Sequence, residues 1–505
     1  MSSPQTSPHT AHSSPAPDPL RWKALIFIGI AQLMVVLDGT VVNIALPHAQ
    51  AALHIPDTNR QWVVTAYSLA FGGLLLFGGR ISDLWGRKRA FVTGLAGFAG
   101  ASALGGAAVN EAMLLVARAG QGVFGALLAP AALSLLSVTF TAPKERAKAF
   151  GIYGAIAGAG SAIGLLLGGL LTEYLDWRWV MFINIPFAAV AATGALTFVR
   201  ERETARNRDR LDIPGVLLAT GAVVSLVYGF TKAASAGWSA AITLAVFALA
   251  AVLLAAFVTV QAKVKSPLLP LRVIADRNRG GAYLTLGLAI VGMFGLFFFL
   301  TFYLQDIRGY SPVTTGFAFL PMVAGMITGS TQIAARLLPR IPARFLMGPG
   351  ILLAAAGMLI LTQLSTTSSY TTVTLPGMLL LGTGMGTMFT PAMSLATYGV
   401  QPRDAGVASA MITTSQQIGG SIGTALLSTI AVNATTGYLT SHHGDPALTA
   451  AQGLVHGYTT AIGWAAAIMT VASVVAFTLI NARGDAFAPK TSTAAGQDAV
   501  PAAAH

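Results

Sequence analysis

Asp38 is the acidic residue of this chain best placed to do chemistry, because it is the only carboxylate well inside one of the long apolar stretches of the sequence. It lies in the run LDGTVVNIALP, residues 37–47. An ionised side chain at bilayer depth costs roughly 2.5–3.5 kcal/mol on insertion scales, so such residues usually bind ions, move protons or balance another charge. The competing interpretation is a structural acid satisfied inside a helix bundle.

Arg118 is a second charge inside an apolar stretch. At about 1.5 Å per residue, Asp38 lies roughly 13 Å from the end of its stretch and Arg118 roughly 9 Å from the start of its own, so the two could meet. A guanidinium favours the charged form of a carboxylate and apolar burial favours the neutral form, so a change in their separation would change proton affinity. We therefore predict a proton-coupling pair, with a static ion pair as the alternative.

The elements that must position this pair are membrane-spanning helices. Apolar residues make up 54% of the chain and charged residues 10%, against roughly 45–50% and 25% in soluble domains. A span needs about 20 apolar residues. The sequence predicts fourteen such spans, near 22–47, 61–79, 90–108, 112–139, 148–172, 178–199, 213–231, 239–260, 281–304, 314–337, 345–364, 372–397, 406–432 and 456–480.

The net charge of +12 follows the membrane topology. If the amino terminus is inside the cell, most of the 30 Lys and Arg residues fall in inner loops and tails, as the positive-inside rule demands. We therefore expect a multi-pass protein of the cell inner (cytoplasmic) membrane with both termini cytoplasmic. The basic excess indicates attraction to anionic membrane lipid and no nucleic-acid partner.

An internal repeat predicts the domain organisation. Glycines at 120–126, Pro130 and the loop 143–146 are echoed by glycines at 382–386, Pro391 and the loop 402–404. Parallel repeats of this kind place a substrate site at the midplane between two rocking halves. We expect six-helix halves at 21–200 and 266–483, an inserted helix pair at 201–265, and disordered cytoplasmic tails at 1–20 and 484–505.

The short loop after the second span is a candidate gating loop. Gly86 permits a tight turn, and Asp83 can accept hydrogen bonds from Arg87 or from a helix amino terminus such as the one near Asp404. If that contact exists in one conformation only, the loop is a latch. Basic residues that only set topology are the alternative. The predicted loop residues are Gly79, Asp83, Gly86, Arg87 and Arg89.

These motifs carry a family resemblance. Residues 79–89, GRISDLWGRKR, resemble the inner-loop signature of the major facilitator superfamily, and residues 37–47 resemble a signature of its 14-span drug:proton antiporters. Residues 118–122, 177–179 and 184–186 extend the match, whereas Leu165 stands where the family's antiporter motif usually has proline. The resemblance implies an all-α major facilitator fold with fourteen transmembrane helices. It also implies export of hydrophobic or amphipathic drugs or antibiotics in exchange for protons by alternating access.

The substrate path is expected to combine uncharged polar groups with aromatic surface. Apolar pockets with few polar anchors suit varied amphipathic ligands, although ordinary packing or lipid contact is the competing interpretation for each residue. The candidates are Gln32, Asn43, Gln121, Phe298, Tyr303, Gln416 and Gln417.

Other classes of protein lack support in the sequence. No Gly-Lys pair occurs, which excludes a P-loop, and the absence of cysteine excludes thiolate sites. The histidines have no metal-ligand spacing, so we expect no metal, no cofactor beyond the coupling proton, and no enzyme activity. We expect a protein that functions as a monomer. Two alternatives stay open: a proton-coupled uptake symporter of a small organic solute, and a non-transporting membrane sensor.

Overall fold

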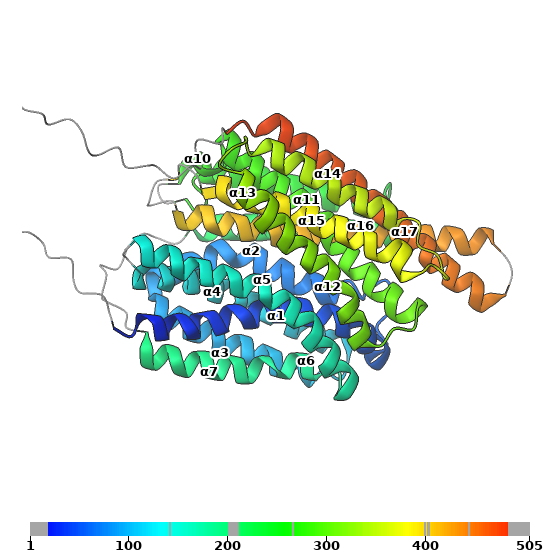
Figure 1. The fold of residues 1–505 in the computed structure, drawn as a ribbon, viewed down its shortest axis with the longest axis horizontal. Helices are drawn as coiled ribbons and strands as arrows, with labels where there is room; N and C mark the ends of the chain where they lie inside the picture. Colours follow the sequence, from blue (N-terminus) through cyan, green and yellow to red (C-terminus); the bar gives the residue numbers. More distant parts are fainter. Residues whose placement is uncertain are drawn as a thin grey trace, which may run out of the picture.

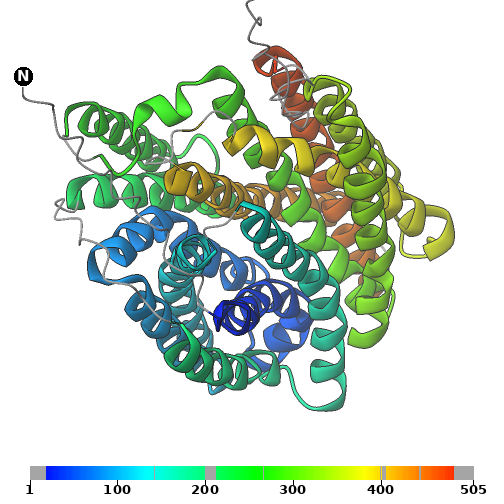
Figure 2. The same ribbon diagram turned by 60° about the vertical axis from the view of Figure 1, so that its left-hand side comes forward.

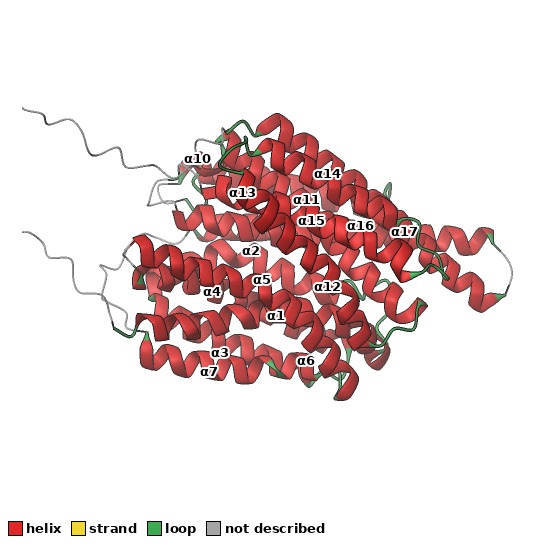
Figure 3. Ribbon diagram, viewed as in Figure 1, coloured by secondary structure: helices red, strands yellow, loops and turns green. Residues whose placement is uncertain are grey.

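The computed structural model of the chain describes residues 19–140, 143–199, 212–264, 267–397, 400, 405–442 and 445–482. These residues form helices and connecting loops, with no strand among them (Figure 3). The predicted tails, the loop 402–404 and the side chain of Asp83 lie outside the described part, apart from residues 19 and 20. The α-helices are α1 Arg21–Leu53, α2 Trp62–Trp85, α3 Arg87–Gly106, α4 Glu111–Thr139, α5 Pro143–Tyr174, α6 Trp179–Phe182, α7 Asn184–Phe198, α8 Ile213–Ala236, α9 Ala241–Lys263, α10 Leu271–Ile274, α11 Arg277–Phe302, α12 Pro312–Thr328, α13 Ala335–Leu337, α14 Arg344–Leu361, α15 Leu375–Thr397, α16 Ala405–Ser441 and α17 Pro446–Leu479.

The long helices lie side by side and give the bundle two ends (Figure 1). We call the end where α1 begins and α17 finishes the terminal face, and the opposite end the distal face. The hairpin of α16 and α17 projects beyond the other helices at the distal face (Figure 1). Three π-helical segments, η1 Tyr303–Ile307, η2 Gly329–Ala334 and η3 Tyr370–Thr374, adjoin α11, α12 and α15.

Twelve helices of the described part are long and apolar enough to cross a membrane. Two further predicted spans, 90–108 and 148–172, coincide with α3 and α5, which have 20 and 32 residues. α3 is rich in glycine and alanine, which contribute less hydropathy than larger apolar residues, and it begins with three basic residues. Within α5, residues Ile163–Tyr174 form a shorter apolar helix. The total of fourteen spans therefore stays a prediction.

Several helices start where the sequence supplies a capping side chain. Asn110 accepts a hydrogen bond from the backbone N–H of Met113 at the start of α4, and Ser311 accepts one from that of Thr314 at the start of α12. Such side chains satisfy amides that have no partner within the helix. Asp212, Asp276 and Asp445 cap α8, α11 and α17 in the same way.

The helices pack in two groups, which Figure 2 shows from a second direction. In the first group α1 packs on α5 and α7, and α4 packs on α2 and α3. In the second group α11, α14, α15, α16 and α17 pack on one another, and α12 packs on α15. The hairpin of α8 and α9 lies beside them, with α8 against both α2 and α16.

Glycine allows the closest helix approaches. A Cβ atom at Gly78 of α2 would lie 2.0 Å from the carbonyl oxygen of Ala126 in α4, and one at Gly419 of α16 would lie 2.4 Å from that of Gly287 in α11. No side chain fits at such distances, so these glycines permit helix backbones to touch.

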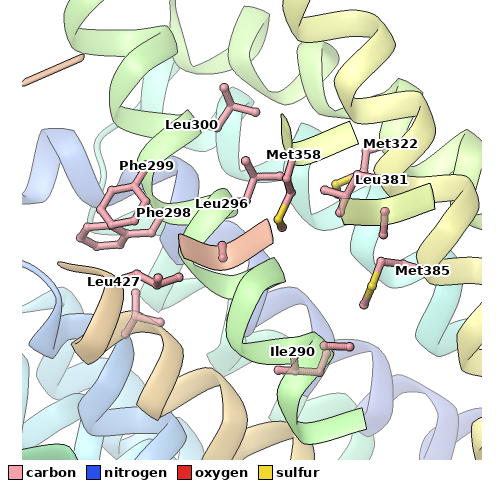
Figure 4. Packing of buried hydrophobic residues seen from close by; sticks show 14 of the residues in the cluster. Ile290, Leu296, Phe298, Phe299, Leu300, Met322, Met358, Leu381, Met385 and Leu427 are labelled. Atoms are coloured by element: carbon pink, nitrogen blue, oxygen red, sulfur yellow. The ribbon is translucent and has the colours of Figure 1, made fainter. Parts of the chain in front are cut away.

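The hydrophobic core changes its composition along α1. Near the terminal face, Ile28 and Met34 pack mainly with residues of α2, α3, α4, α5 and α7, and Ala410 of α16 lies at the edge of this cluster. Toward the distal face, Val41 and Ile44 belong to a larger cluster shared with the second group. Figure 4 shows part of that cluster around α11, where Phe298 and Phe299 pack near Leu427. The larger cluster shared by the two groups therefore lies toward the distal face, and a smaller one joins Phe77 of α2 to Met411 of α16 nearer the terminal face.

Candidate functional site

The carboxylate of Asp38 lies at the centre of a buried polar cluster. The residue is 1% exposed on α1. Its Oδ2 accepts a hydrogen bond from Arg118 Nη1 at 2.7 Å. Its Oδ1 accepts from Gln121 Nε2 and from Asn184 Nδ2, each at 2.8 Å. Three donors from two other helices therefore satisfy the charged carboxylate, which buried anions require.

Arg118 and Gln121 lie three residues apart on α4, so they share one helix face. Arg118 is 1% exposed, and its Nε donates to the carbonyl oxygen of Val63 in α2 at 3.0 Å. Its Nη1 also donates to Gln121 Oε1 at 2.8 Å. Both ends of the Gln121 amide are thereby occupied, which fixes its orientation toward Asp38.

Two further helices complete the cluster. Ser102 of α3 is buried, and its Oγ accepts from Gln121 Nε2 at 2.8 Å and from Asn184 Nδ2 at 3.2 Å. Asn184 is the first residue of α7 and is 1% exposed. Five helices of the first group, α1 to α4 and α7, thus converge on one carboxylate.

The face of Tyr67 covers the guanidinium of Arg118. The Cζ atom lies 4.5 Å from the centre of the Tyr67 ring. A cation over a ring face is stabilised by the ring quadrupole, by about 2 kcal/mol when desolvated. Arg118 is therefore held by a carboxylate, a carbonyl oxygen, an amide oxygen and an aromatic face.

The charge balance of this cluster depends on the negative charge of Asp38. Asp38 and Arg118 together carry no net charge, and a buried pair of this kind is tolerated because each charge compensates the other. A proton on Asp38 would leave the Arg118 charge uncompensated in a medium of low dielectric constant. Loss of that negative charge would therefore favour a rearrangement that gives Arg118 water or another anion.

The other predicted path residues of the first group make local contacts. The carboxamide oxygen of Gln32 accepts a hydrogen bond from the hydroxyl of Tyr153 in α5. The amide of Asn43 donates to the carbonyl oxygen of Gly39 on its own helix at 2.8 Å. Neither of these hydrogen bonds involves Asp38, whereas Gln121, also placed on the substrate path, donates to Asp38 Oδ1.

The predicted path residues of the second group lie in two places. Phe298 and Tyr303 are buried near the distal face, and the Tyr303 hydroxyl donates to the carbonyl oxygen of Ser365 at 2.8 Å. Gln416 and Gln417 are half-buried on α16. A Cβ atom at Gly72 of α2 would lie 2.7 Å from the Gln417 Cβ, so Gln417 faces the first group.

The predicted gating loop is a junction of one residue. α2 ends at Trp85 and α3 begins at Arg87, and Gly86 between them has φ 106° and ψ 134°. Glycine adopts this backbone conformation without strain. Gly86 therefore permits the tight turn between α2 and α3 that the sequence predicted. Arg89 is exposed, and Gly79 faces Pro130 of α4.

A second buried arginine, Arg60, lies at the distal face. It precedes α2 and is 6% exposed. Its Cζ lies 3.9 Å from the ring centre of Phe302, 5.4 Å from that of Phe298 and 5.7 Å from that of Tyr458. Its Nη2 donates to the Tyr458 hydroxyl at 3.2 Å. A cation of the first group therefore sits in an aromatic cage formed by α11 and α17 of the second.

More contacts join the two groups at this face. Gln305 Nε2 donates to the carbonyl oxygen of Ile44 at 2.9 Å, and Glu173 accepts from the backbone N–H of Val313 at 3.0 Å. A Cβ atom at Gly316 of α12 would lie 2.6 Å from the carbonyl oxygen of Leu165. Leu165, the residue that departs from the antiporter motif, thus lies at the contact between α5 and α12.

Sequence reasoning missed Asn184, Ser102, Tyr67 and Arg60 as members of these clusters. Depth arithmetic could have found Asn184, because it lies six residues into the predicted span 178–199 and so about 9 Å deep, like Arg118. Ser102 and Tyr67 carried no charge to single them out. Arg60 lies between the predicted spans 22–47 and 61–79, in a loop, where an arginine usually contacts water. No group of three metal-ligating residues occurs within the described ranges.

The family model described as Major Facilitator Superfamily matches residues 28–424. The chain is 52% identical to the puromycin resistance protein pur8 of Streptomyces alboniger, over 96% of each chain. It is 38% identical to the cephamycin export protein CmcT of Amycolatopsis lactamdurans, over 84% of this chain and 88% of that protein. Among solved structures, the crystal structure of peptide transporter POT in complex with sulfate has a similar fold, with a TM-score of 0.65 and 14% identity over 90% of this chain and 93% of that one.

Proposed function

The chain belongs to the major facilitator superfamily, and we propose that it exports a hydrophobic or amphipathic antibiotic across the cytoplasmic membrane in exchange for protons. The observation that carries the coupling is the buried Asp38 carboxylate, 2.7 Å from Arg118 and held by two amides. The substrate class rests on the relatives, which are a puromycin resistance protein and a cephamycin export protein. Puromycin is the first compound to test.

Asp38 is proposed to bind a proton from outside the cell and to release it inside as the substrate leaves. Each pH unit across the membrane supplies about 1.4 kcal/mol per proton, and each 100 mV supplies about 2.3 kcal/mol per charge. Proton binding unbalances the Asp38–Arg118 pair, and substrate binding on the inner side would favour proton release. Arg118 is thus the partner through which the charge of Asp38 acts on the helices.

Alternating access would use the two helix groups as its moving parts. We propose that the terminal face is cytoplasmic and the distal face extracellular, with both termini inside. The contacts of Arg60 with Tyr458 and of Gln305 with Ile44 would then close the outside, and opening to the outside requires that they break. The shared core toward the distal face supports a structure that is closed on the outer side.

The domain organisation and site assignments from the sequence are part of this proposal. The halves are 21–200 and 266–483, with an inserted pair at 201–265 and cytoplasmic tails at 1–20 and 484–505. Gly79, Asp83, Gly86, Arg87 and Arg89 would form the gating loop. The substrate path would be lined by Gln32, Asn43, Gln121, Phe298, Tyr303, Gln416 and Gln417. The protein would work as a monomer in contact with membrane lipid, without a cofactor other than the proton.

Transport in everted membrane vesicles tests the proposal. With an imposed pH gradient, acid inside, we expect radiolabelled puromycin to accumulate in vesicles that contain the chain, and to do so no longer when a protonophore collapses the gradient. Vesicles with Asp38→Asn provide the matched control. Movement of puromycin out of the vesicles together with the protons would instead establish an uptake symporter. Absence of flux for a panel of antibiotics, with no gain in resistance of a pump-deficient host, would favour a sensor.

A further inference from the structure

One oxygen beside the proposed proton site is buried without a hydrogen-bond partner. This atom is Asn184 Oδ1, which has no partner within the described part of the chain. The nitrogen of the same amide makes two hydrogen bonds, to Asp38 Oδ1 at 2.8 Å and to Ser102 Oγ at 3.2 Å. Buried carbonyl oxygens are rarely left unpaired, because they lose hydration without compensation.

The unpaired oxygen matters because a protonated Asp38 would need an acceptor. The ionised carboxylate only accepts hydrogen bonds, whereas the neutral acid also has an O–H to donate. Arg118 offers donors only. Gln121 Oε1 already accepts from Arg118 Nη1 at 2.8 Å, and turning that amide over would point its NH₂ group at the guanidinium. Asn184 Oδ1 is the carbonyl oxygen beside the acid that is not engaged.

Ser102 allows the Asn184 amide to turn over without losing its other contact. In the structure the hydroxyl oxygen of Ser102 accepts from Asn184 Nδ2. A hydroxyl group can also donate, because its hydrogen rotates. After a rotation of about 180° around the Asn184 Cβ–Cγ bond, Oδ1 would occupy the place of Nδ2, where it could accept from both Asp38 and Ser102.

We propose that Asn184 is a positioning residue that serves both protonation states of Asp38. Its NH₂ group donates to the carboxylate, and after rotation its carbonyl oxygen accepts the O–H of the acid. The inference rests on the proposed function, in which Asp38 takes up and releases a proton. The proton is bound at Asp38 Oδ1 and leaves from the same atom, so Asn184 neither gains nor loses one.

The surroundings of Asp38 support this assignment. The titratable or charged groups that face the cluster are Arg118 from α4 and Tyr67 from α2. α3 and α7 contribute Ser102 and Asn184, whose hydroxyl and amide groups do not titrate in the working range. The group beside Asp38 that can change from hydrogen-bond donor to acceptor is therefore the Asn184 amide, with Ser102 as its partner.

Infrared difference spectroscopy of the purified protein in lipid, between alkaline and acid pH, tests this inference. The carbonyl band of the protonated carboxyl group is assigned to Asp38 by its loss in Asp38→Asn. In Asn184→Leu we expect that band to move to higher wavenumber, because the acid has lost a partner. In the wild-type protein labelled with ¹³C in the asparagine side-chain amide, we expect an amide carbonyl band to move to lower wavenumber as Asp38 takes its proton. This amide signal should be absent in Asn184→Leu.

Controls separate the possible failures. Thr193→Val alters a hydroxyl on the same helix that bonds only its own backbone in the structure, and it should leave both bands in place. Asn184→Thr retains a group that donates and accepts, and should keep the Asp38 band closer to its wild-type position than Asn184→Leu does. If the Asp38 band appears but the asparagine amide band does not respond to pH, the role of Asn184 is overturned and the proposed proton site stands. Complete absence of an Asp38 band in the wild-type protein overturns the proposed proton site as well.

Discussion

The buried charges of two arginines, Arg118 and Arg60, are stabilised by different kinds of contact. Arg118 is neutralised by Asp38, a carboxylate 2.7 Å away within its own helix group. Arg60 has a weaker contact with the exposed carboxylate of Asp57 at 3.4 Å, and it faces aromatic rings of the other group. The contacts between Arg118 and Asp38 are kept in any motion that moves α1, α4 and α7 together. The second is lost when the groups separate, so of these two arginines Arg60 is the one that can report on opening at the distal face.

Loss of Asp38 should have the largest effect on transport. Asp38→Asn keeps the shape of the side chain and an acceptor for Arg118, but it cannot bind the coupling proton. We expect a folded protein whose gradient-driven export falls to the level of empty vesicles. Export of puromycin by vesicles, with size-exclusion chromatography as the folding control, measures both properties. Loss of folding together with transport would favour the static ion pair.

Loss of Arg118 should have the largest effect on stability. Arg118→Met leaves the Asp38 charge buried without its cation, which typically costs about 3–5 kcal/mol. Denaturation in detergent compares this variant with Arg118→Lys, which keeps the charge but not the planar guanidinium. We expect the lysine variant to lie between the wild-type protein and the methionine variant. Equal stability of all three would mean that the pair does not hold the first group together.

Replacement of Arg60 should shift the conformational equilibrium more than it weakens the fold. Arg60→Met removes a desolvated cation–π contact of about 2 kcal/mol, which corresponds to a change in an equilibrium constant of up to roughly thirtyfold. The chain has no cysteine, so a single Ile44→Cys can report access to the distal face. We expect faster labelling by an impermeant maleimide in the Arg60→Met background.

The reference position for this experiment is Thr440→Cys, at an exposed site on α16. Its labelling rate should be the same whether Arg60 is present or replaced by methionine, because the site is already open to the reagent. An unchanged rate at position 44 would argue that the cage does not close the distal face.

The smallest effect is expected at the partly exposed pair of Arg21 and Glu145. The hydrogen bonds from Arg21 at 2.8 and 2.9 Å lower the pKa of the Glu145 carboxyl group. A lowered pKa in the folded protein means that the pair contributes stability above the ordinary glutamate value and loses it as the pH falls through the folded value. Arg21→Ala should therefore lower the melting temperature slightly at neutral pH, and the difference should vanish in acid. A difference that persists in acid would indicate packing rather than charge.

The meeting of Asp38 and Arg118 was predictable because charge inside apolar stretches is rare and helix depth follows from residue number. The helical character of the chain was predictable for the same reason, since long apolar stretches have few alternatives in a membrane. The role assigned to the pair stays a prediction, as does the total of fourteen spans.

The remaining members of both clusters depend on the rotation of helices about their own axes. Asn184 and Ser102 reach Asp38 because α7 and α3 present those faces to α1 and α4, and no pattern along either segment encodes that choice. The cage around Arg60 joins residues that are 398 positions apart in sequence, Arg60 and Tyr458. Only the packing of the two groups brings them together.

The single-residue junction at Gly86 has a mechanical consequence. Only Gly86 separates α2 from α3, so the end of α2 and the start of α3 stay within one residue of each other in any conformation of the protein. α3 carries Ser102, which contacts both amides that hold Asp38, and α2 carries the carbonyl oxygen of Val63, to which Arg118 is bound. A displacement of the Gly86 junction at the terminal face would therefore act on two separate contacts of the cluster around Asp38, one through each helix.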